Sequence, residues 1–275
     1  MSGTLYLCAT PIGNLDDMTF RAIKILREVD LIAAEDTRHT RKLLTHFEIH
    51  TPMIRFDENC KSIVGEKILQ RLQAGESVAV VSDAGLPAIS DPGADLVKLA
   101  VDAGIKVSPI PGANAALSAL ICSGLDTTKF LFAGFAPKTK KNRREFLQKL
   151  STVDATIIFY EAPHRLKNFL TELAEVFGQR QAVLARELTK IHEEFLHGEI
   201  SELAEKISEP RGEFVIVVEG KTFSEQIETP DESISAVVEK FMADGLDKKS
   251  AMREAAKIFN VSRREIYNKL LSLEL

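Results

Sequence analysis

Short apolar runs alternate with longer amphipathic stretches over roughly the first four-fifths of the chain. Apolar runs that end in turn residues predict buried strands over residues 4–10, 30–35, 77–83, 106–111, 130–136, 156–162, 182–189, 190–198 and 213–220. The stretches between them repeat apolar residues at helical spacing and predict helices over residues 18–28, 37–47, 61–74, 91–103, 141–150, 163–177 and 200–207. Over residues 4–111 this alternation predicts a mainly parallel sheet covered by helices, and the chain as a whole is predicted to be α/β.

The helix predicted over residues 91–103 has the clearest start and stop signals. Asp91 can cap it, Pro92 suits the first helical position, and Gly104 stands where a C-terminal cap glycine belongs. We therefore expect this helix to begin directly after Asp91.

The pattern changes after residue 222. The polar run SEQIETPDES predicts a linker, and the residues beyond it contain no strand-like run. Three helices are predicted instead, over residues 232–243, 248–258 and 262–272. Ser262 followed by Glu265 forms a capping-box pattern, so the last two helices have the signature of a helix-turn-helix. A three-helix packing module with no nucleic-acid role is the alternative.

These shifts divide the chain into three predicted regions. We expect an N-terminal α/β domain over residues 1–118, a second α/β domain over residues 119–222 and a helical module over residues 231–275.

Composition excludes several classes of protein. With 35 Lys and Arg against 40 Asp and Glu, the 275-residue chain carries a net charge of −5, which argues against binding nucleic acid through charge alone. No apolar run is long enough for a membrane helix, and no secretory signal is visible. Cys8, Cys60 and Cys122 are odd in number and far apart, so a reducing compartment, the cytoplasm, is expected. The six histidines are scattered, and no metal site is predicted.

Loops rich in glycine and proline follow four of the predicted strands, over residues 9–17, 82–93, 109–117 and 160–166. Ligands of open α/β sheets bind beyond the carboxyl ends of the strands, so four such loops could enclose a nucleoside-sized molecule. Each loop alone could equally be a tight turn. Asp83 ends an apolar strand and would present its carboxylate to a ligand with amino or hydroxyl donors, or it could simply cap a helix.

The motifs ATPIGNLDD, AAEDTRHTRKLL, VVSDAGLPAISDPG, IPGANAALSAL, FYEAPHRL and EFVIVVEG follow one another along nearly the whole chain. In this order they resemble the tetrapyrrole methylase superfamily, and within it the branch that methylates small-subunit ribosomal RNA. The resemblance implies S-adenosylmethionine-dependent methylation of the ribose 2′-hydroxyl of a cytidine in the decoding region of 16S rRNA. It also implies two α/β domains with the cofactor between them, and a homodimer.

The same resemblance implies which residues bind the cofactor. The superfamily's Gly-Asp-Pro loop is replaced here by Ser82-Asp83-Ala84-Gly85-Leu86, which leaves the main-chain contacts open while Asp83 keeps its place. The implied set is Pro11, Ile12, Gly13, Ser82, Asp83, Gly85, Leu86, Pro111, Gly112, Ala113, Asn114, Tyr160, Glu161 and Ala162.

A ribose hydroxyl is a weak nucleophile, so a general base or a cation near the developing alkoxide would assist the transfer. We hypothesise that Glu161 or Arg186 lies within reach of the methyl group. The wider set of candidates is Glu35, Asp36 and Glu187 as bases, with Arg38 and Arg165 as cations. A structural ion pair is the alternative for each of them.

Two basic segments are candidates for RNA contact. Residues 138–149 carry a net charge of +5, and residues 36–42 add a second basic turn next to the expected cleft. The predicted RNA-binding residues are Arg38, Arg41, Lys42, Lys140, Lys141, Arg143 and Arg144. A solvated face is the alternative for either segment.

Two other functions stay open. A methyltransferase acting on a tetrapyrrole or another small molecule is the nearer alternative, although it needs neither the basic run nor the helical module. A nucleotide-sensing regulator with a helix-turn-helix output is the more distant one.

Overall fold

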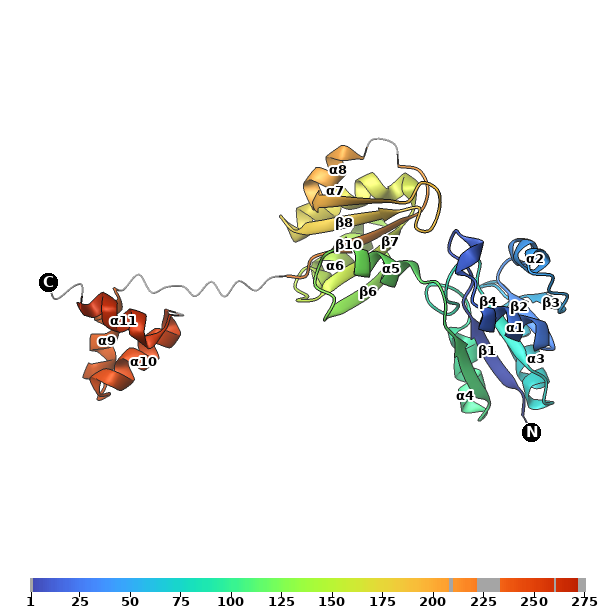
Figure 1. Cartoon of the computed structure of the whole chain (residues 1–275), viewed down its shortest axis with the longest axis horizontal. Helices are drawn as coiled ribbons and strands as arrows, with labels where there is room; N and C mark the ends of the chain where they lie inside the picture. The colour runs from blue at the N-terminus through green and yellow to red at the C-terminus, as the bar shows by residue number, and fades with distance from the viewer. Residues whose placement is uncertain (1, 208–209, 222–232, 260, 272–275) are drawn as a thin grey trace. The chain divides into compact units, whose positions relative to one another are not determined.

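The structure is a computed structural model that describes residues 2–207, 210–221, 233–259 and 261–271. It divides into two compact units, Met1–Lys221 and Thr222–Leu275 (Figure 1). The first unit holds two sheets with their helices, and the second is helical.

The first sheet is entirely parallel, with the strand order β3-β2-β4-β1-β5. Its elements are β1 (Thr4–Cys8), the short 3-10 helix η1 (Leu15–Asp17), α1 (Phe20–Glu28), β2 (Leu31–Ala34), α2 (Thr37–His46), β3 (Met53–Arg55), α3 (Lys61–Gln73), β4 (Val78–Val81), α4 (Ala94–Asp102) and β5 (Lys106–Ile110). Alternate strand residues face opposite ways, so Ala79 and Val81 pack with α1 and α2, whereas Val78 and Val80 pack with α3 and α4. Both faces are covered, which explains why the inner strands β2 and β4 are apolar throughout.

The second sheet is mixed, with the strand order β6-β7-β10-β8-β9; β6 pairs with β7 in parallel, and the other three pairings are antiparallel. Its elements are α5 (Ala115–Cys122), β6 (Phe130–Phe135), α6 (Lys140–Leu150), β7 (Thr156–Glu161), α7 (Pro163–Phe177), β8 (Gln181–Arg186), β9 (Glu194–Glu199), α8 (Ile200–Lys206) and β10 (Phe214–Val218). One face packs against α6, α7 and α8, and the other packs against α5. The buried ring of Phe159 lies at the centre of the first of these cores, 5.3 Å from the ring of Phe169.

The predicted α/β class and the alternation of elements are confirmed, with three local differences. β3 is only three residues long, too short to give a periodic signal. α5 was not predicted because its sequence AALSALIC is apolar on every side, although Asn114 caps it by accepting a hydrogen bond from Leu117 N–H at 2.9 Å. The boundary proposed at residue 118 falls inside α5, which packs against β7 and β10.

The predicted start of α4 is wrong. The helix begins at Ala94, with Gly93 as the residue before it at a φ of 138°, and Asp91 makes no capping hydrogen bond. A φ in this region favours glycine, so the chain turns at Gly93 before it enters the helix. Asp91 is thereby left in the loop.

The second unit contains α9 (Ile234–Ala243), α10 (Lys248–Ile258) and α11 (Arg263–Leu271), close to the predicted bounds. The three helices pack around a small core that includes Val237, Ala255 and Ile266. The predicted capping box is confirmed, since Ser262 N–H donates to Glu265 Oε2 at 2.7 Å and Glu265 N–H donates to Ser262 Oγ at 3.2 Å. The predicted linker lies outside the described residues. No helix in the described part of the chain is long and apolar enough to cross a membrane.

Candidate functional site

The loops after β1 and β4 are joined to each other at the carboxyl edge of the first sheet. Thr10 N–H donates to Gly85 O at 2.9 Å, and Gly85 N–H donates to Thr10 O at 3.1 Å. The hydroxyl of Thr10 also donates to Ser82 O at 3.2 Å. These bonds hold both loops in fixed positions beyond the ends of adjacent parallel strands, where α/β sheets bind ligands.

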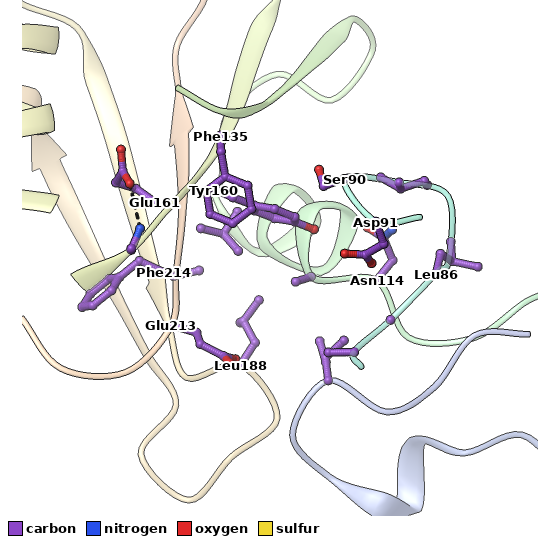
Figure 2. A pocket seen from close by; sticks show the side chains of 18 of the residues that line it. Leu86, Ser90, Asp91, Asn114, Phe135, Tyr160, Glu161, Leu188, Glu213 and Phe214 are labelled. Atoms are coloured by element: carbon purple, nitrogen blue, oxygen red, sulfur yellow. Dashed lines mark hydrogen bonds between the residues drawn. The ribbon is translucent and has the colours of Figure 1, made fainter. Parts of the chain in front are cut away.

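A cavity of about 360 Å³ lies beside these loops. It receives side chains from the first-sheet loops, from the start of α5 and from the ends of β6, β7, β8 and β10 (Figure 2). Its lining residues are Ile12, Ala84, Gly85, Leu86, Ile89, Ser90, Asp91, Asn114, Ala115, Phe135, Tyr160, Glu161, Ala162, Pro163, Ala185, Leu188, Glu213, Phe214 and Val215. The volume lies within the range of small-molecule sites, and most of the lining is apolar with a few polar groups.

The structure brings only some of the predicted cofactor residues to this cavity. Those that line it are Ile12, Gly85, Leu86, Asn114, Tyr160, Glu161 and Ala162. Those that do not line it are Pro11, Gly13, Ser82, Asp83, Pro111, Gly112 and Ala113. Two of the glycines serve close packing instead: a Cβ at Gly112 would lie 2.7 Å from Ala9 Cβ, and one at Gly13 would lie 2.9 Å from Leu188 O.

Asp83, the residue with the clearest argument from sequence, links the ends of two strands. Its Oδ1 accepts a hydrogen bond from Asp36 N–H at 3.2 Å, and its own N–H donates to Glu35 Oε2 at 3.3 Å. The carboxylate that was expected to face a ligand thus fixes the turn between β2 and α2.

Asp91, unlike Asp83, lines the cavity, whereas sequence reasoning assigned it to a helix cap. It lies in the loop between β4 and α4, and Figure 2 shows its carboxylate directed toward the side of the cavity where Tyr160 lies. Burial raises the pKa of Asp91 to about 6, helped by the charges of Glu35 and Asp83 and opposed by a hydrogen bond from Ser82.

Aromatic rings form the opposite wall. The ring of Tyr160 lies 5.0 Å from that of Phe132 and 5.5 Å from that of Phe135, both edge to face. Burial raises the pKa of Tyr160, and the charge of Asp91 adds to the rise. Tyr160 stays neutral at physiological pH, and this wall suits a flat heteroaromatic ring.

Glu161 is among the residues that line the cavity, but its carboxylate is buried and directed away from Asp91 (Figure 2). Oε1 accepts a hydrogen bond from Ala162 N–H at 2.8 Å, and Oε2 lies 3.2 Å from Arg165 Nη2 without hydrogen-bond alignment. Burial raises the pKa of Glu161, while the guanidinium groups of Arg165 and Arg143 oppose the rise. Arg165 also donates to Ala136 O at 2.9 Å, so this pair fixes the turn into α7.

Arg186, the other predicted catalytic residue, is not among the lining residues. Its Nε donates to Arg211 O at 2.8 Å, and its Nη1 lies 3.4 Å from Glu194 Oε2. Its guanidinium also lies 6.0 Å from the centre of the Phe214 ring. Arg186 therefore has a backbone and a carboxylate partner outside the lining of the cavity.

A strained turn between β8 and β9 carries Leu188 into the cavity. Glu187 and Thr189, on either side of Leu188, have φ values of 51° and 64°, which cost about 1–3 kcal/mol each for residues other than glycine. Lys190 secures the turn by donating to Glu187 Oε1 at 2.9 Å and to Glu213 Oε2 at 3.0 Å. The strain maintains one wall of the cavity.

The predicted RNA-binding residues on α2 are exposed at the surface. These residues are Arg38, Arg41 and Lys42, and together with Thr45 and His46 they line a shallow depression. Arg38 is held by Asp36 at 2.8 Å while its side chain stays 90% exposed. Asp36 begins α2 directly after β2, so this basic surface starts at the carboxyl edge of the first sheet.

The residues predicted on α6 divide into two kinds. Lys140 and Lys141 are exposed. Arg143 is not available as predicted, because its side chain is only 12% exposed and donates to both carboxylate oxygens of Glu172 at 2.6 and 2.7 Å. Arg144 is exposed and lies 3.7 Å from Glu175.

Within the described part of the chain, no three His, Cys, Asp or Glu side chains form a group that could hold a metal ion.

A family model described as Tetrapyrrole (Corrin/Porphyrin) Methylases matches residues 4–204. Among curated proteins, the chain is 50% identical over 273 residues to a ribosomal RNA small subunit methyltransferase I from Halalkalibacterium halodurans, covering 97% of this chain and 94% of that protein. It is 48% identical over 276 residues to the protein of the same name from Synechocystis sp., covering 99% and 98%.

Solved structures share the fold at low sequence identity. The uroporphyrin-III C-methyltransferase of Thermus thermophilus, complexed with S-adenosyl homocysteine, matches with a TM-score of 0.57 at 17% identity, covering 79% of this chain and 97% of that one. A diphthine synthase matches with a TM-score of 0.61 at 16% identity, covering 80% and 91%. At this identity the likeness shows the fold alone.

Proposed function

The chain belongs to the tetrapyrrole methylase family, and from this premise we propose that it is an S-adenosylmethionine-dependent RNA methyltransferase. The proposed substrate is 16S rRNA, free or in the small ribosomal subunit, and the proposed acceptor is the ribose 2′-hydroxyl of a cytidine in its decoding region. The cavity beside the loops after β1 and β4 carries the proposal, because it combines an aromatic wall with a half-buried carboxylate.

The residues of the cavity fit the cofactor. The rings of Phe135 and Tyr160, with the apolar side chains of Leu86 and Leu188, suit an adenine base. When bound, S-adenosylmethionine supplies a methyl group on a positively charged sulfur. The apolar lining and the strained turn at Leu188 exclude water around the reacting atoms, and fixed alignment contributes much of the rate.

The exposed cations on α2 are the proposed contact for the RNA backbone. Arg38, Arg41 and Lys42 lie on a helix that starts at the same sheet edge as the cavity loops. Phosphate contacts position a nucleic acid without reading its sequence, so this surface would orient the RNA while the cavity selects the nucleotide. Lys140 and Lys141 are proposed as a second contact.

Several finer properties belong to the same proposal. We place the protein in the cytoplasm, as a homodimer built from two α/β domains and a helical module.

The test is incubation with S-adenosylmethionine carrying a labelled methyl group. Small ribosomal subunits lacking this methylation, naked 16S rRNA and a tetrapyrrole are offered separately. After nuclease digestion and mass spectrometry, label in 2′-O-methylcytidine is the expected result. Label only in the tetrapyrrole would select the small-molecule alternative. Absence of label, together with specific retention of DNA, would select the regulator.

A further inference from the structure

We propose that Asp91 is the general base that accepts the proton of the ribose hydroxyl during methyl transfer. The proposal rests on the methyltransferase function proposed above and adds a residue to it. Of the two hypothesised catalytic residues, Glu161 directs its carboxylate toward Ala162 N–H and Arg165, and Arg186 is a cation that cannot accept a proton.

The backbone of the loop is built to direct Asp91 into the cavity. Ala88 and Ser90 both have a φ of 66°, a left-handed conformation that costs about 1–3 kcal/mol for residues other than glycine. Gly93, at a φ of 138°, packs against Ala88, with 3.2 Å between the Ala88 Cβ and the position of a Cβ on Gly93. Because a standard helix start at Asp91 would avoid this strain, the loop maintains the aspartate in the cavity at a cost in stability.

The surroundings of Asp91 give its carboxylate a hydrogen bond from Ser82 but no cationic partner. Glu35 follows β2, Asp83 follows β4, and Tyr160 faces it from β7, and none of these side chains is a cation. Within the described part of the chain, no Lys, Arg or His lies within ion-pair distance of it. A general base works best when its pKa is close to the pH of the reaction, and a carboxylate raised toward neutrality meets that condition.

The proposed step is balanced. The hydroxyl oxygen forms a bond to the methyl carbon as the carbon–sulfur bond breaks, and the sulfonium becomes a neutral thioether. The hydroxyl proton passes to the Asp91 carboxylate and is later released to water. No oxidant, reductant or metal is required.

Three variants of the full chain test the role: D91N, D91E and, as a matched control, D95N. Asp95 lies nearby on α4, where it is exposed and paired with Lys61 at 2.9 Å. In single-turnover assays with the RNA substrate, we expect D91N to lose about 10²–10⁴-fold in rate, D91E to recover part of it, and D95N to match the wild type. The dissociation constant of S-adenosylhomocysteine, measured by calorimetry, should change less than threefold in all three.

The dependence of folding stability on pH gives a readout that is independent of activity. In the wild type, the pKa of Asp91 is raised in the folded state, so folding is favoured by protonation and stability declines as pH rises from about 4 through about 6. D91N removes this decline, so its urea midpoint at pH 7.5 should exceed that of the wild type. The wild-type rate should also show an acid limb near pH 6 that D91N lacks.

The outcomes separate the two proposals. A wild type that transfers no methyl group to RNA overturns the proposed function. An active wild type with an equally active D91N overturns only the base role, as does a D91N variant whose rate and cofactor affinity fall together, because Asp91 would then bind the cofactor.

Discussion

The helices α2 and α6 are both short and basic, yet they use their charges in opposite ways. The basic side chains of α2 have a single acidic partner in the described part of the chain, Asp36, which pairs with Arg38. On α6, Arg143 and Arg144 face α7, which carries Glu172 and Glu175. Two of the six basic residues in 138–149 are therefore engaged by a neighbouring helix, whereas the partner on α2 is the residue that caps the helix itself. The number of charges in a segment does not reveal how many of them a neighbouring helix neutralises.

The largest expected effect concerns stability. Replacing Arg143 by alanine leaves Glu172, only 16% exposed, without its bidentate partner, and should lower the free energy of unfolding by about 2–3 kcal/mol. Urea unfolding followed by circular dichroism measures this, since the chain has no tryptophan. R144A removes a pair whose side chains are more than half exposed and should cost at most about 0.5 kcal/mol. Equal stability of the two variants would contradict a structural role for Arg143.

The same pair has a predictable dependence on pH. The hydrogen bonds from Arg143 lower the pKa of Glu172 below its ordinary value. Stability from a carboxylate of lowered pKa is present above its unfolded pKa, about 4.3, and is lost as pH falls through the folded value. The difference between wild type and R143A should therefore be constant from pH 5 to 8 and shrink in more acidic solution. A difference that persists undiminished at pH 3 would contradict the assignment.

The next effect concerns RNA affinity and separates the two helices by function. The double variant R41A/K42A removes two exposed cations from α2 and should weaken RNA binding about tenfold at moderate salt. The slope of log affinity against log salt should fall by about 2. Filter binding to 16S rRNA at several salt concentrations measures both, and R143A should leave the slope unchanged. The control is K98A, which removes an exposed lysine on α4. An equal loss of RNA affinity in K98A would show that the effect of R41A/K42A is unspecific.

Two Ser-Asp pairs in the loop SDAGLPAISDPG show how far sequence reasoning reaches. Asp83 follows a predicted strand directly, so its position at the sheet edge was predictable, whereas its hydrogen bond from Asp36 joins residues 47 positions apart. Asp91 precedes Pro92, and this combination is typical of a helix start. The turn that moves it into the cavity depends on left-handed Ala88 and Ser90, and neither residue type signals that conformation.

Elsewhere in the chain, too, local patterns could be predicted from the sequence and contacts between distant residues could not. The strands and most helices were predictable because their apolar spacing is local, and the capping box at Ser262 and Glu265 needed only four residues. The partner of Arg143 is 29 residues away on another helix, and no local pattern marks it. Four cavity loops could be predicted from turn residues, but the walls at Leu188 and Phe214 come from the turn after β8 and the start of β10, and the order of these strands is set by packing.

The prediction with the smallest expected effect concerns Arg38, which is exposed like Arg41 but ion-paired like Arg143. Its guanidinium is bound by both carboxylate oxygens of Asp36, at 3.2 and 2.8 Å, although the side chain is exposed. D36N keeps an acceptor that can cap α2 through Arg38 N–H, since asparagine caps as well as aspartate. It also releases the guanidinium from its ion pair, so RNA affinity should rise by a factor of about 2–3 and the salt slope should steepen by up to about 1. If D36N binds RNA no better than the wild type while R38A binds more weakly, Arg38 already contacts the RNA with Asp36 in place. If neither variant changes binding, the contact surface on α2 is confined to Arg41 and Lys42, farther along the helix from the cavity edge.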